Sequence, residues 1–398
     1  YSLPGHRSNC SRNGGGIWVR LQYLPQHGLG GQFPFADAEG LRSLLIFMAG
    51  SPSVLDTEAV RVTLSRVREP DLGKDLVTLG MIEALEVDDQ ARSVRFLIRL
   101  TTPSCPLKDR MEADCRAALA EDWGPDLQVD IRMEARTLGR AQGMDWLPEV
   151  RNLVMVASGK GGVGKTTVAV NLARALAASG AAVGLLDADL YGPNVPILLG
   201  AEDRQPGLKE GRMTPVEVEG LRMMSVGLLI DPARPLIWRG PMASNTLKQF
   251  FSEVDWGELD YLVMDLPPGT GDVQLTLTKL FPEAFGLLVT TPQAMAVADA
   301  LKAGRMFQTE GTKLHLLGLV ENMAWFSPED RPDQRYHPFG KEGIHALAER
   351  LGLECLASLP MVEGSTQGPS VAGTPIAQAY LDLAGEVSRR IAMHHRST

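Results

Sequence analysis

The chain has 398 residues, of which 44% are hydrophobic and 22% charged, and this length and composition exclude a disordered polypeptide. No run of 18 apolar residues is present, and the longest suspicious stretch, residues 41–48, is far too short to span a membrane. The 39 basic and 48 acidic residues give a net charge of −9, which argues against a general binder of nucleic acid or anionic membranes. We therefore expect a globular protein with neither nucleic acid nor membrane among its partners.

The first 47 residues differ in character from the rest, and residues 1–37 show neither helical nor strand periodicity. Ordinary protein patterning starts at Met48, so residues 1–47 are interpreted as upstream sequence read as protein or as a natural disordered tail. No function is placed there.

A small α+β domain is predicted over residues 48–137. Val60, Leu64 and Val67 recur at helical spacing before Pro70, which ends the helix. Strands are then expected at 77–87 and 94–101, a helix from Pro106 to Ala120, and a strand at 127–133. A linker at 138–151 follows, because this stretch contains two glycines and a proline.

From residue 152 to 398 short apolar runs alternate with helical patterns. Continuous apolar runs are typical of strands that are covered on both faces, and helices between them indicate parallel strands. The fold class is therefore α/β: a doubly wound, mostly parallel sheet, preceded by the small α+β domain. The runs lie at 153–157, 183–186, 261–264, 287–290 and 316–320.

The strongest motif follows the first of these runs and precedes a helix predicted at 168–178. It matches G-x-x-x-x-G-K-[ST], in which glycines let backbone N–H groups surround a polyphosphate at a helix N-terminus. Lys165 can reach the β- and γ-phosphates, and the Thr166 hydroxyl can bind Mg²⁺. A plain glycine-rich turn is the alternative. The motif is Gly159-Lys160-Gly161-Gly162-Val163-Gly164-Lys165-Thr166-Thr167.

Lys160 is a second lysine inside this loop, where a general P-loop has no fixed residue. A cation near the γ-phosphate can stabilise charge that builds up during phosphoryl transfer, as an arginine finger does. The alternative is a lysine that faces solvent.

The loop, together with four further motifs, resembles the deviant P-loop ATPases of septum-site, chromosome-partition and nitrogenase iron-protein type. Within them it is similar to the Mrp-type (ApbC-like) iron–sulfur cluster carriers, and the small domain resembles the iron–sulfur-assembly domain often fused ahead of them. The motifs are Leu185-Leu-Asp187-Ala-Asp189-Leu-Tyr-Gly-Pro193-Asn-Val-Pro196, Trp238-Arg-Gly-Pro-Met242, Asp265-Leu-Pro-Pro-Gly-Thr-Gly-Asp272 and Val320-Glu-Asn-Met323 in the ATPase, with Glu69-Pro-Asp-Leu-Gly73 and Thr101-Thr-Pro-Ser-Cys-Pro-Leu-Lys-Asp109 in the small domain.

This resemblance implies a role for each matching residue. Lys160 would cross a homodimer interface to the partner's nucleotide, and Asp189 would orient the attacking water. Asp187 and Asp265 would hold Mg²⁺ through water, at the strand ends where ligands bind in open α/β sheets. Gly269 would sense the γ-phosphate, while Asn322 would read the adenine edge with Pro360 packing nearby. For Asp187 and Asp265, a helix or turn cap is the alternative.

The match to the family breaks at the cluster ligands. Many relatives carry Cys-x-x-Cys shortly after the Glu-Asn-Met segment, whereas residues 324–340 contain no cysteine. Asp330, Asp333 and His337 in this stretch can bind a harder metal, but a solvated loop is the expected structure. Thiolates are what iron–sulfur clusters need, so the family's usual cluster site is absent from this chain.

Four cysteines are present, Cys10, Cys105, Cys115 and Cys355, and none forms a Cys-x-x-Cys pair. Cys105 is expected at the start of the helix that runs to Ala120, where the helix dipole lowers a thiol's pKa. It is therefore the candidate iron–sulfur ligand, with a small residue packing a turn as the alternative. Cys115 and Cys355 are expected to be buried as small apolar residues.

Three functions are compatible with these features. The first is an ATP-hydrolysing carrier of iron–sulfur clusters with slow turnover, located in the cytoplasm, with ATP and Mg²⁺ as cofactors and apoproteins and assembly factors as partners. The second is a nucleotide-switched dimeric scaffold of the partition or septum-site kind, without a cluster. The third is a nucleotide-gated chaperone or adaptor for apoproteins, and the fused small domain favours the first and third.

Overall fold

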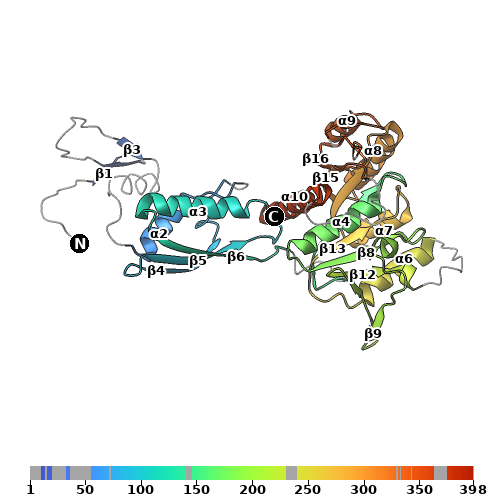
Figure 1. The fold of residues 1–398 in the computed structure, drawn as a ribbon, viewed down its shortest axis with the longest axis horizontal. Coiled ribbons are helices and arrows are strands. Elements are labelled where there is room, and N and C mark those ends of the chain that lie inside the picture. The colour runs from blue at the N-terminus through green and yellow to red at the C-terminus, as the bar shows by residue number, and fades with distance from the viewer. Residues whose placement is uncertain are drawn as a thin grey trace. The chain divides into compact units, whose positions relative to one another are not determined.

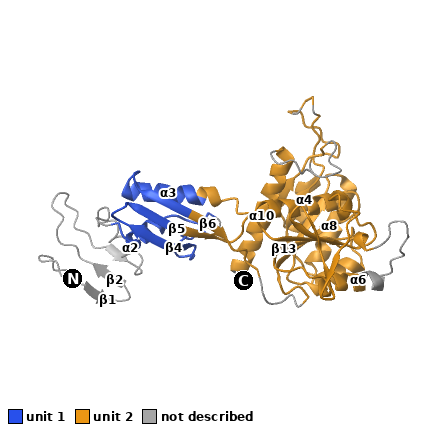
Figure 2. Ribbon diagram, turned by 60° about the horizontal axis from the view of Figure 1, so that its bottom comes forward, with its two compact units in different colours: residues 1–96, 111–131 blue, residues 97–110, 132–398 orange. Residues whose placement is uncertain are grey.

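The computed structural model describes residues 10–13, 16–19, 33–35, 55–70, 73–139, 146–229, 240–328, 330–331, 333–341, 343–362 and 374–397. The chain divides into two compact units (Figure 2): unit 1 contains residues 1–96 and 111–131, and unit 2 contains residues 97–110 and 132–398. The predicted domain limits at 137 and 151 stay predictions.

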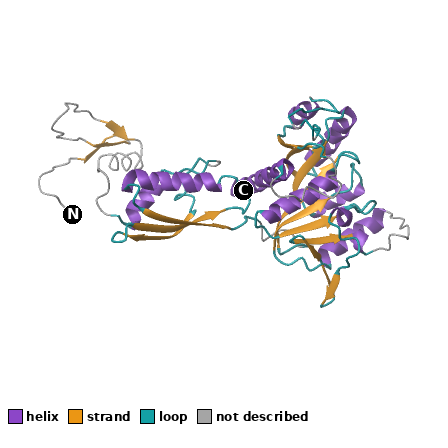
Figure 3. Cartoon of the chain, in the orientation of Figure 1, coloured by secondary structure: helices purple, strands orange, loops and turns teal. Residues whose placement is uncertain are grey.

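A three-stranded sheet with two helices follows the predicted element order of the small domain (Figures 1 and 3). Ion pairs join Arg95 to Asp130 and Arg99 to Glu134, in both cases residues 35 apart, so β5 and β6 run parallel. The predicted alternation on β5 is confirmed, since Val94, Phe96, Ile98 and Leu100 are all buried. The elements are α2 (Thr57–Leu64), β4 (Ile82–Asp88), β5 (Ser93–Leu100), α3 (Lys108–Trp123) and β6 (Gln128–Ala135).

Two predicted boundaries in this part of the chain are wrong for a local reason. Residues 77–81 form a turn instead of the start of a strand, because Asp75 accepts from the Thr78 N–H at 2.7 Å and Gly80 has a φ of 66°. The helix predicted from Pro106 begins two residues later, because residues 103–107 fold into turns. Within residues 1–47 the described elements are three short antiparallel strands, β1 (Cys10–Asn13), β2 (Gly16–Val19) and β3 (Phe33–Phe35).

Unit 2 is built on an eight-stranded sheet in the order β11-β12-β8-β13-β7-β14-β15-β16. All five predicted runs are strands of this sheet. Every pairing is parallel except that of β11 with β12, so the doubly wound, mostly parallel sheet is confirmed. The strands are β7 (Val150–Ser158), β8 (Val183–Asp187), β11 (Val216–Val218), β12 (Leu221–Ser225), β13 (Leu259–Asp265), β14 (Phe285–Thr290), β15 (His315–Glu321) and β16 (Cys355–Ser358).

Two buried apolar clusters, one on each face, hold helices against this sheet. One contains residues of α4 and α10, such as Leu172 and Val387, and the other contains Phe250, Leu277 and Phe307 from α6, α7 and α8. The remaining elements are α4 (Lys165–Ala178), α5 (Val195–Leu198), the hairpin β9 (Gly207–Lys209) and β10 (Arg212–Thr214), η1 (Val226–Leu228), α6 (Gly240–Ser252), α7 (Asp272–Leu280), α8 (Ala294–Gln308), α9 (Gly343–Leu351) and α10 (Pro375–Ser397).

The strand order reverses its direction around β7. The chain leaves β7 towards β8 on one side of the sheet, and β14 later pairs with β7 on its other side. Ligands of open α/β sheets bind at the carboxyl ends of the strands at such a switch point. Among the described residues, no helix is both long and apolar enough to cross a membrane.

Candidate functional site

The glycine-rich loop lies at this switch point, between the carboxyl end of β7 and the N-terminus of α4. Gly164 is the N-cap of α4 and has a φ of 81°, and Gly162 has a φ of 83°; both angles favour glycine. A Cβ on Gly164 would lie 2.1 Å from Asn322 Nδ2, and a Cβ on Gly159 would lie 2.2 Å from the Asp299 carbonyl carbon. The loop therefore takes its shape from glycines that are required by both conformation and space, as the motif predicts.

Lys165 and Thr166 both bind Asp265, the last residue of β13. Lys165 Nζ donates to Asp265 Oδ1 at 2.5 Å, and Thr166 Oγ1 donates to Oδ2 at 2.7 Å. The Asp265 side chain is fully buried and that of Lys165 is 6% exposed. Burial raises the pKa of Asp265, and the Lys165 ammonium opposes this rise. The ion pair thus neutralises a carboxylate that would otherwise be unstable in the interior.

Asp187 ends the neighbouring strand β8 and lies directly opposite Asp265 in the parallel register. It is completely buried and accepts hydrogen bonds from the Val195 and Asp189 backbone N–H groups and from the Ser225 hydroxyl. Burial, together with the nearby charge of Asp265, raises the pKa of Asp187 to about 8. The prediction that both carboxyl groups meet at the edge of the sheet is thereby confirmed.

This pKa predicts how the stability of the free chain depends on pH. Asp187 holds its proton up to about pH 8 in the folded chain but releases it near 3.8 once unfolded. Folding therefore retains a proton between these pH values, and the contribution of Asp187 to the free energy of unfolding falls as the pH rises from about 4 to about 8. We expect Asp187→Asn, which cannot ionise, to gain in melting temperature relative to the natural chain as the pH increases. Thermal unfolding at several pH values checks this, and a difference that is the same at every pH would contradict it.

Lys160 has a hydrogen-bond partner within the chain, and Asp189 follows the end of β8 by two residues. Lys160 Nζ donates to Gln293 Oε1 at 3.3 Å, and Gln293 is the N-cap residue of α8. Burial raises the pKa of Asp189, and the charge of Lys165 opposes this rise. The roles of Lys160 towards a partner's nucleotide and of Asp189 towards water stay predictions.

Gly269 follows β13 in a loop that is tied to the phosphate loop. Its N–H donates to the Ser158 carbonyl at 2.8 Å, and its φ is 91°. The buried Gln274 amide donates to the carbonyls of Pro267, Pro268 and Gly269. Gln274 thus fixes the segment that follows Asp265. The role of Gly269 as a sensor of the γ-phosphate stays a prediction.

Asn322 follows β15 and contacts the phosphate loop from the other side. Its Nδ2 donates to the Val163 carbonyl at 2.9 Å, and its N–H donates to the Thr290 carbonyl. The next residue, Met323, has a left-handed φ of 54°, a conformation that is uncommon for a residue other than glycine. Pro360 is half-buried just beyond β16. Adenine recognition by Asn322 and Pro360 stays a prediction.

The residues at this edge of the sheet fit Mg²⁺. The Thr166 hydroxyl and the Asp187 and Asp265 carboxyl groups offer oxygen atoms, which are the ligands Mg²⁺ prefers. When bound, the metal would neutralise phosphate charge, and Thr166 and Asp265 would exchange their mutual hydrogen bond for it.

The thiols are placed differently from two of the sequence-based expectations. Cys105 lies three residues before the first residue of α3 and is half-exposed in a turn, so the argument from the helix dipole is wrong. Cys115 is buried as predicted, and burial raises its pKa to about 12. Cys355 is only half-buried; its Sγ donates to the Ala357 carbonyl, and burial raises its pKa. In the described part of the chain, no three His, Cys, Asp or Glu residues are grouped to hold a metal ion.

The segment that replaces the Cys-x-x-Cys of relatives is closed on itself by side-chain and backbone contacts. Phe326 and Tyr336 pair through their backbones, and the Arg335 guanidinium lies 4.4 Å from the centre of the Trp325 ring. His337 Nδ1 lies 2.9 Å from the Ala324 carbonyl oxygen. This segment is thus built from aromatic and cationic contacts, whereas a cluster would need thiolates.

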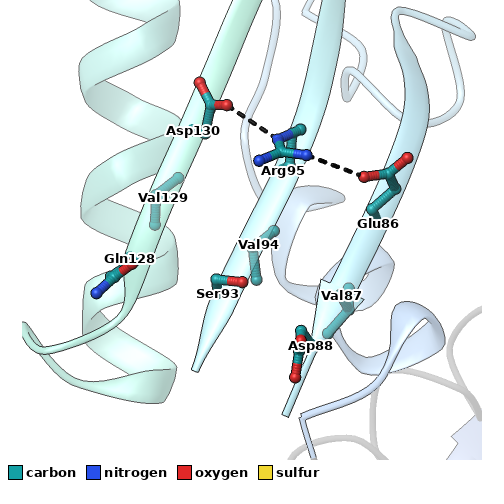
Figure 4. A pocket seen from close by; sticks show the side chains of 9 residues that line it. All are labelled: Glu86, Val87, Asp88, Ser93, Val94, Arg95, Gln128, Val129 and Asp130. Carbon is teal, nitrogen blue, oxygen red and sulfur yellow. Dashed lines mark hydrogen bonds and ion pairs between the residues drawn. The ribbon is translucent and has the colours of Figure 1, made fainter. Parts of the chain in front are cut away.

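A second hollow, in unit 1, contains none of the predicted site residues. It has a volume of about 650 Å³ on the open face of the small sheet. Figure 4 shows the Arg95 guanidinium between Glu86 and Asp130, with ion-pair distances of 3.4 and 3.0 Å. These side chains are more than half exposed, so the pairs contribute little stability. Of the predicted motifs, Trp238 and Arg239 lie outside the described residues, as do Asp71 and Leu72.

A glycine-rich loop between a strand and a helix, with its lysine and threonine against a strand-end carboxylate, defines a P-loop nucleoside triphosphatase. Residues 149–392 match the family model of ParA, described as the NUBPL iron-transfer P-loop NTPases, and residues 57–154 match that of iron–sulfur cluster assembly proteins. The first match covers more than half of the chain, which therefore belongs to the family of NUBPL-type iron-transfer P-loop NTPases.

Individual relatives are similar over most of their length. An iron–sulfur cluster carrier protein of Synechocystis sp. is 42% identical over 85% of this chain and 99% of its own. A protein of the same description from Deinococcus radiodurans is 42% identical over 84% of this chain and 93% of its own. A solved nucleotide-binding protein from Archaeoglobus fulgidus in complex with ADP is 32% identical, with 60% of this chain and 88% of that chain covered and a TM-score of 0.46.

Three residues of the site were missed by the sequence reasoning. Ser225 donates to Asp187, Gln274 fixes the loop after Asp265, and Gln293 binds Lys160. Ser225 ends β12 and Gln293 follows β14 by three residues, so the rule that ligands gather at strand ends could have found both. Gln274 lies within α7 and carries no comparable signal.

Proposed function

We propose that this chain is an ATP-binding and ATP-hydrolysing carrier that assembles iron–sulfur clusters or delivers them to apoproteins. The observation that carries the proposal is the complete P-loop site on a chain that is 42% identical to a relative named as an iron–sulfur cluster carrier, over 99% of that relative. Slow turnover and a cytoplasmic location belong to the same proposal.

The proposed reaction uses the residues at the edge of the sheet. Lys165 binds the β- and γ-phosphates, Thr166 and the two strand-end carboxylates hold hydrated Mg²⁺, and Asp189 orients the attacking water. Lys160 leaves Gln293 and reaches the nucleotide of a second copy, so that hydrolysis requires a homodimer. Lys160 belongs to the loop, and its ammonium group donates to the Gln293 side chain, so breaking this hydrogen bond frees the lysine for the exchange.

The cluster is the cargo of the carrier, and Cys105 is the proposed thiol ligand. Of the thiols whose surroundings are described, Cys115 is buried with a pKa near 12, and burial raises the pKa of Cys355. Cys105 is half-buried in a turn, within the motif that resembles the iron–sulfur-assembly domain. Two copies supply two such thiolates, and a partner supplies the rest. A scaffold without a cluster is the alternative, and no observation favours it over the carrier.

Anaerobic reconstitution with iron and sulfide distinguishes the carrier from the scaffold. We expect the natural chain to bind iron and sulfide in about equal amounts with a visible charge-transfer absorption. Cys105→Ser should lose most of the bound iron and sulfide and of the absorption. Cys355→Ser is a matched change at a thiol that is also half-buried, and it should keep both. A natural chain that binds no iron or sulfide would refute the carrier, and loss in both variants would refute Cys105 as the specific ligand.

A further inference from the structure

The loop that carries Cys105 is fastened within unit 2 at one buried polar contact. Thr102 Oγ1 and Tyr261 Oη lie 3.1 Å apart, and the two residues are only 2% and 1% exposed. Thr102 also organises the loop itself, because its hydroxyl accepts from the Ser104 N–H and its carbonyl accepts from the Cys105 N–H, both at 3.3 Å. The Thr102 side chain therefore connects the backbone around the thiol to the strand β13.

Around this contact the packing is close but poor in hydrogen bonds. A Cβ on Gly385 of α10 would lie 3.2 Å from the Ser104 carbonyl oxygen, so the helix backbone touches the loop. The Ser104 hydroxyl is buried and has no hydrogen-bond partner among the described residues, and the buried Ser388 hydroxyl lies next to that of Tyr261. Ser388 lies close enough to favour ionisation of Tyr261, although burial raises the pKa of Tyr261 overall.

The unpartnered Ser104 hydroxyl weakens the closed arrangement of the loop. It has given up hydrogen bonds to water without regaining them in the protein, and exposure to water would restore them. The Thr102–Tyr261 bond is a side-chain hydrogen bond that opposes such an opening at this point.

Tyr261 lies at the opposite end of β13 from the nucleotide site. It is the third residue of the strand, and Asp265 is its last. Four residues of extended strand span roughly 13 Å. Tyr261 therefore touches neither the phosphate loop nor the metal-binding edge, and its substitution leaves that machinery intact.

We propose that Tyr261 is a positioning residue for the Cys105 thiol: its hydroxyl holds Thr102, keeps the loop closed against α10, and controls how readily Cys105 is exposed. That Cys105 serves as a cluster ligand rests on the proposed function. The closure of the loop does not depend on it and is measurable without nucleotide, iron or sulfide.

Two measurements on the full chain test the proposal. One is amide hydrogen exchange, and the other is the rate at which iodoacetamide alkylates Cys105, followed by mass spectrometry. Tyr261→Phe and Thr102→Val remove one hydroxyl each and preserve shape, Thr102→Ser keeps the hydroxyl, and Tyr336→Phe makes the same change at an exposed tyrosine. In Tyr261→Phe we expect amide exchange at residues 102–107 and alkylation of Cys105 to accelerate about 2- to 13-fold, the range for one lost hydrogen bond. Thr102→Val also removes the acceptor of the Ser104 N–H, so its acceleration should be at least as large. Thr102→Ser and Tyr336→Phe should match the natural chain.

A double variant tests the proposal further, and two outcomes would contradict it. Adding Tyr261→Phe to Thr102→Val should accelerate exchange and alkylation by less than Tyr261→Phe does alone. The reason is that both changes remove the same Thr102–Tyr261 bond. Unchanged loop exchange in Tyr261→Phe would overturn the proposal, as would an equal acceleration throughout β13 and α4, which indicates general destabilisation. Failure of iron to bind in the reconstitution experiment would refute the carrier function and leave these exchange results unaffected.

Discussion

Lys165→Ala is expected to abolish nucleotide binding. The ammonium group is the cation placed to meet the β- and γ-phosphates, and no other lysine or arginine side chain in the described part of the chain bonds Asp265. Its removal also leaves the buried Asp265 carboxylate without its ion pair beside Asp187, which costs about 3–5 kcal/mol of folding stability. Isothermal titration with ATP and Mg²⁺ measures binding, and thermal unfolding measures the second effect.

A matched control separates these effects from the general loss of a lysine. Lys209→Ala removes an exposed lysine on β9 and should change neither binding nor melting temperature. Circular dichroism must show that Lys165→Ala is folded at the temperature of the titration. A folded Lys165→Ala chain that binds ATP with unchanged affinity would show that the loop is not the phosphate site.

Lys160→Ala is expected to keep nucleotide binding but lose hydrolysis by about 10³-fold or more, the scale of a missing arginine finger. Lys160 is bonded only to Gln293 among the contacts recorded for its ammonium group, so its removal leaves the Lys165–Asp265 pair intact. Phosphate release measures hydrolysis. Size-exclusion chromatography with and without ATP measures dimer formation, which should also be lost.

Gln293→Ala is the informative companion to this variant. It removes the partner that holds Lys160 in the free chain but leaves the lysine itself, so hydrolysis should be retained. If Lys160→Ala hydrolyses ATP at the natural rate, the loop lysine takes no part in catalysis and the proposed exchange between copies is wrong.

The phosphate site was predictable because its chemistry is local in sequence. The loop, its strand and its helix are contiguous, and Asp187 and Asp265 each follow an apolar run directly. Since parallel strands end at one edge of a sheet, separate runs were enough to place both carboxyl groups together.

What could not be predicted depends on contacts between segments distant in sequence. Strands β11, β12 and β16 were not predicted, because they are short and polar residues such as Glu217 in β11 and Arg222 in β12 interrupt their apolar runs. The turn at Asp75 overrides the strand preference of the residues after it through one side-chain hydrogen bond. The position of Cys105 before α3, and its loop's contact with Tyr261, 159 residues away, follow from tertiary packing.

The bonding of Lys165 and Thr166 to Asp265 also affects the stability of the chain when no nucleotide is bound. The pocket supplies its own counter-ion, so the interior carries no bare charge when product has departed. The chain can therefore stay folded until it binds the next triphosphate. Magnesium bound at Thr166 and Asp265, as proposed, would displace contacts that already exist, and the affinity for nucleotide would then be lower than the number of new bonds alone suggests.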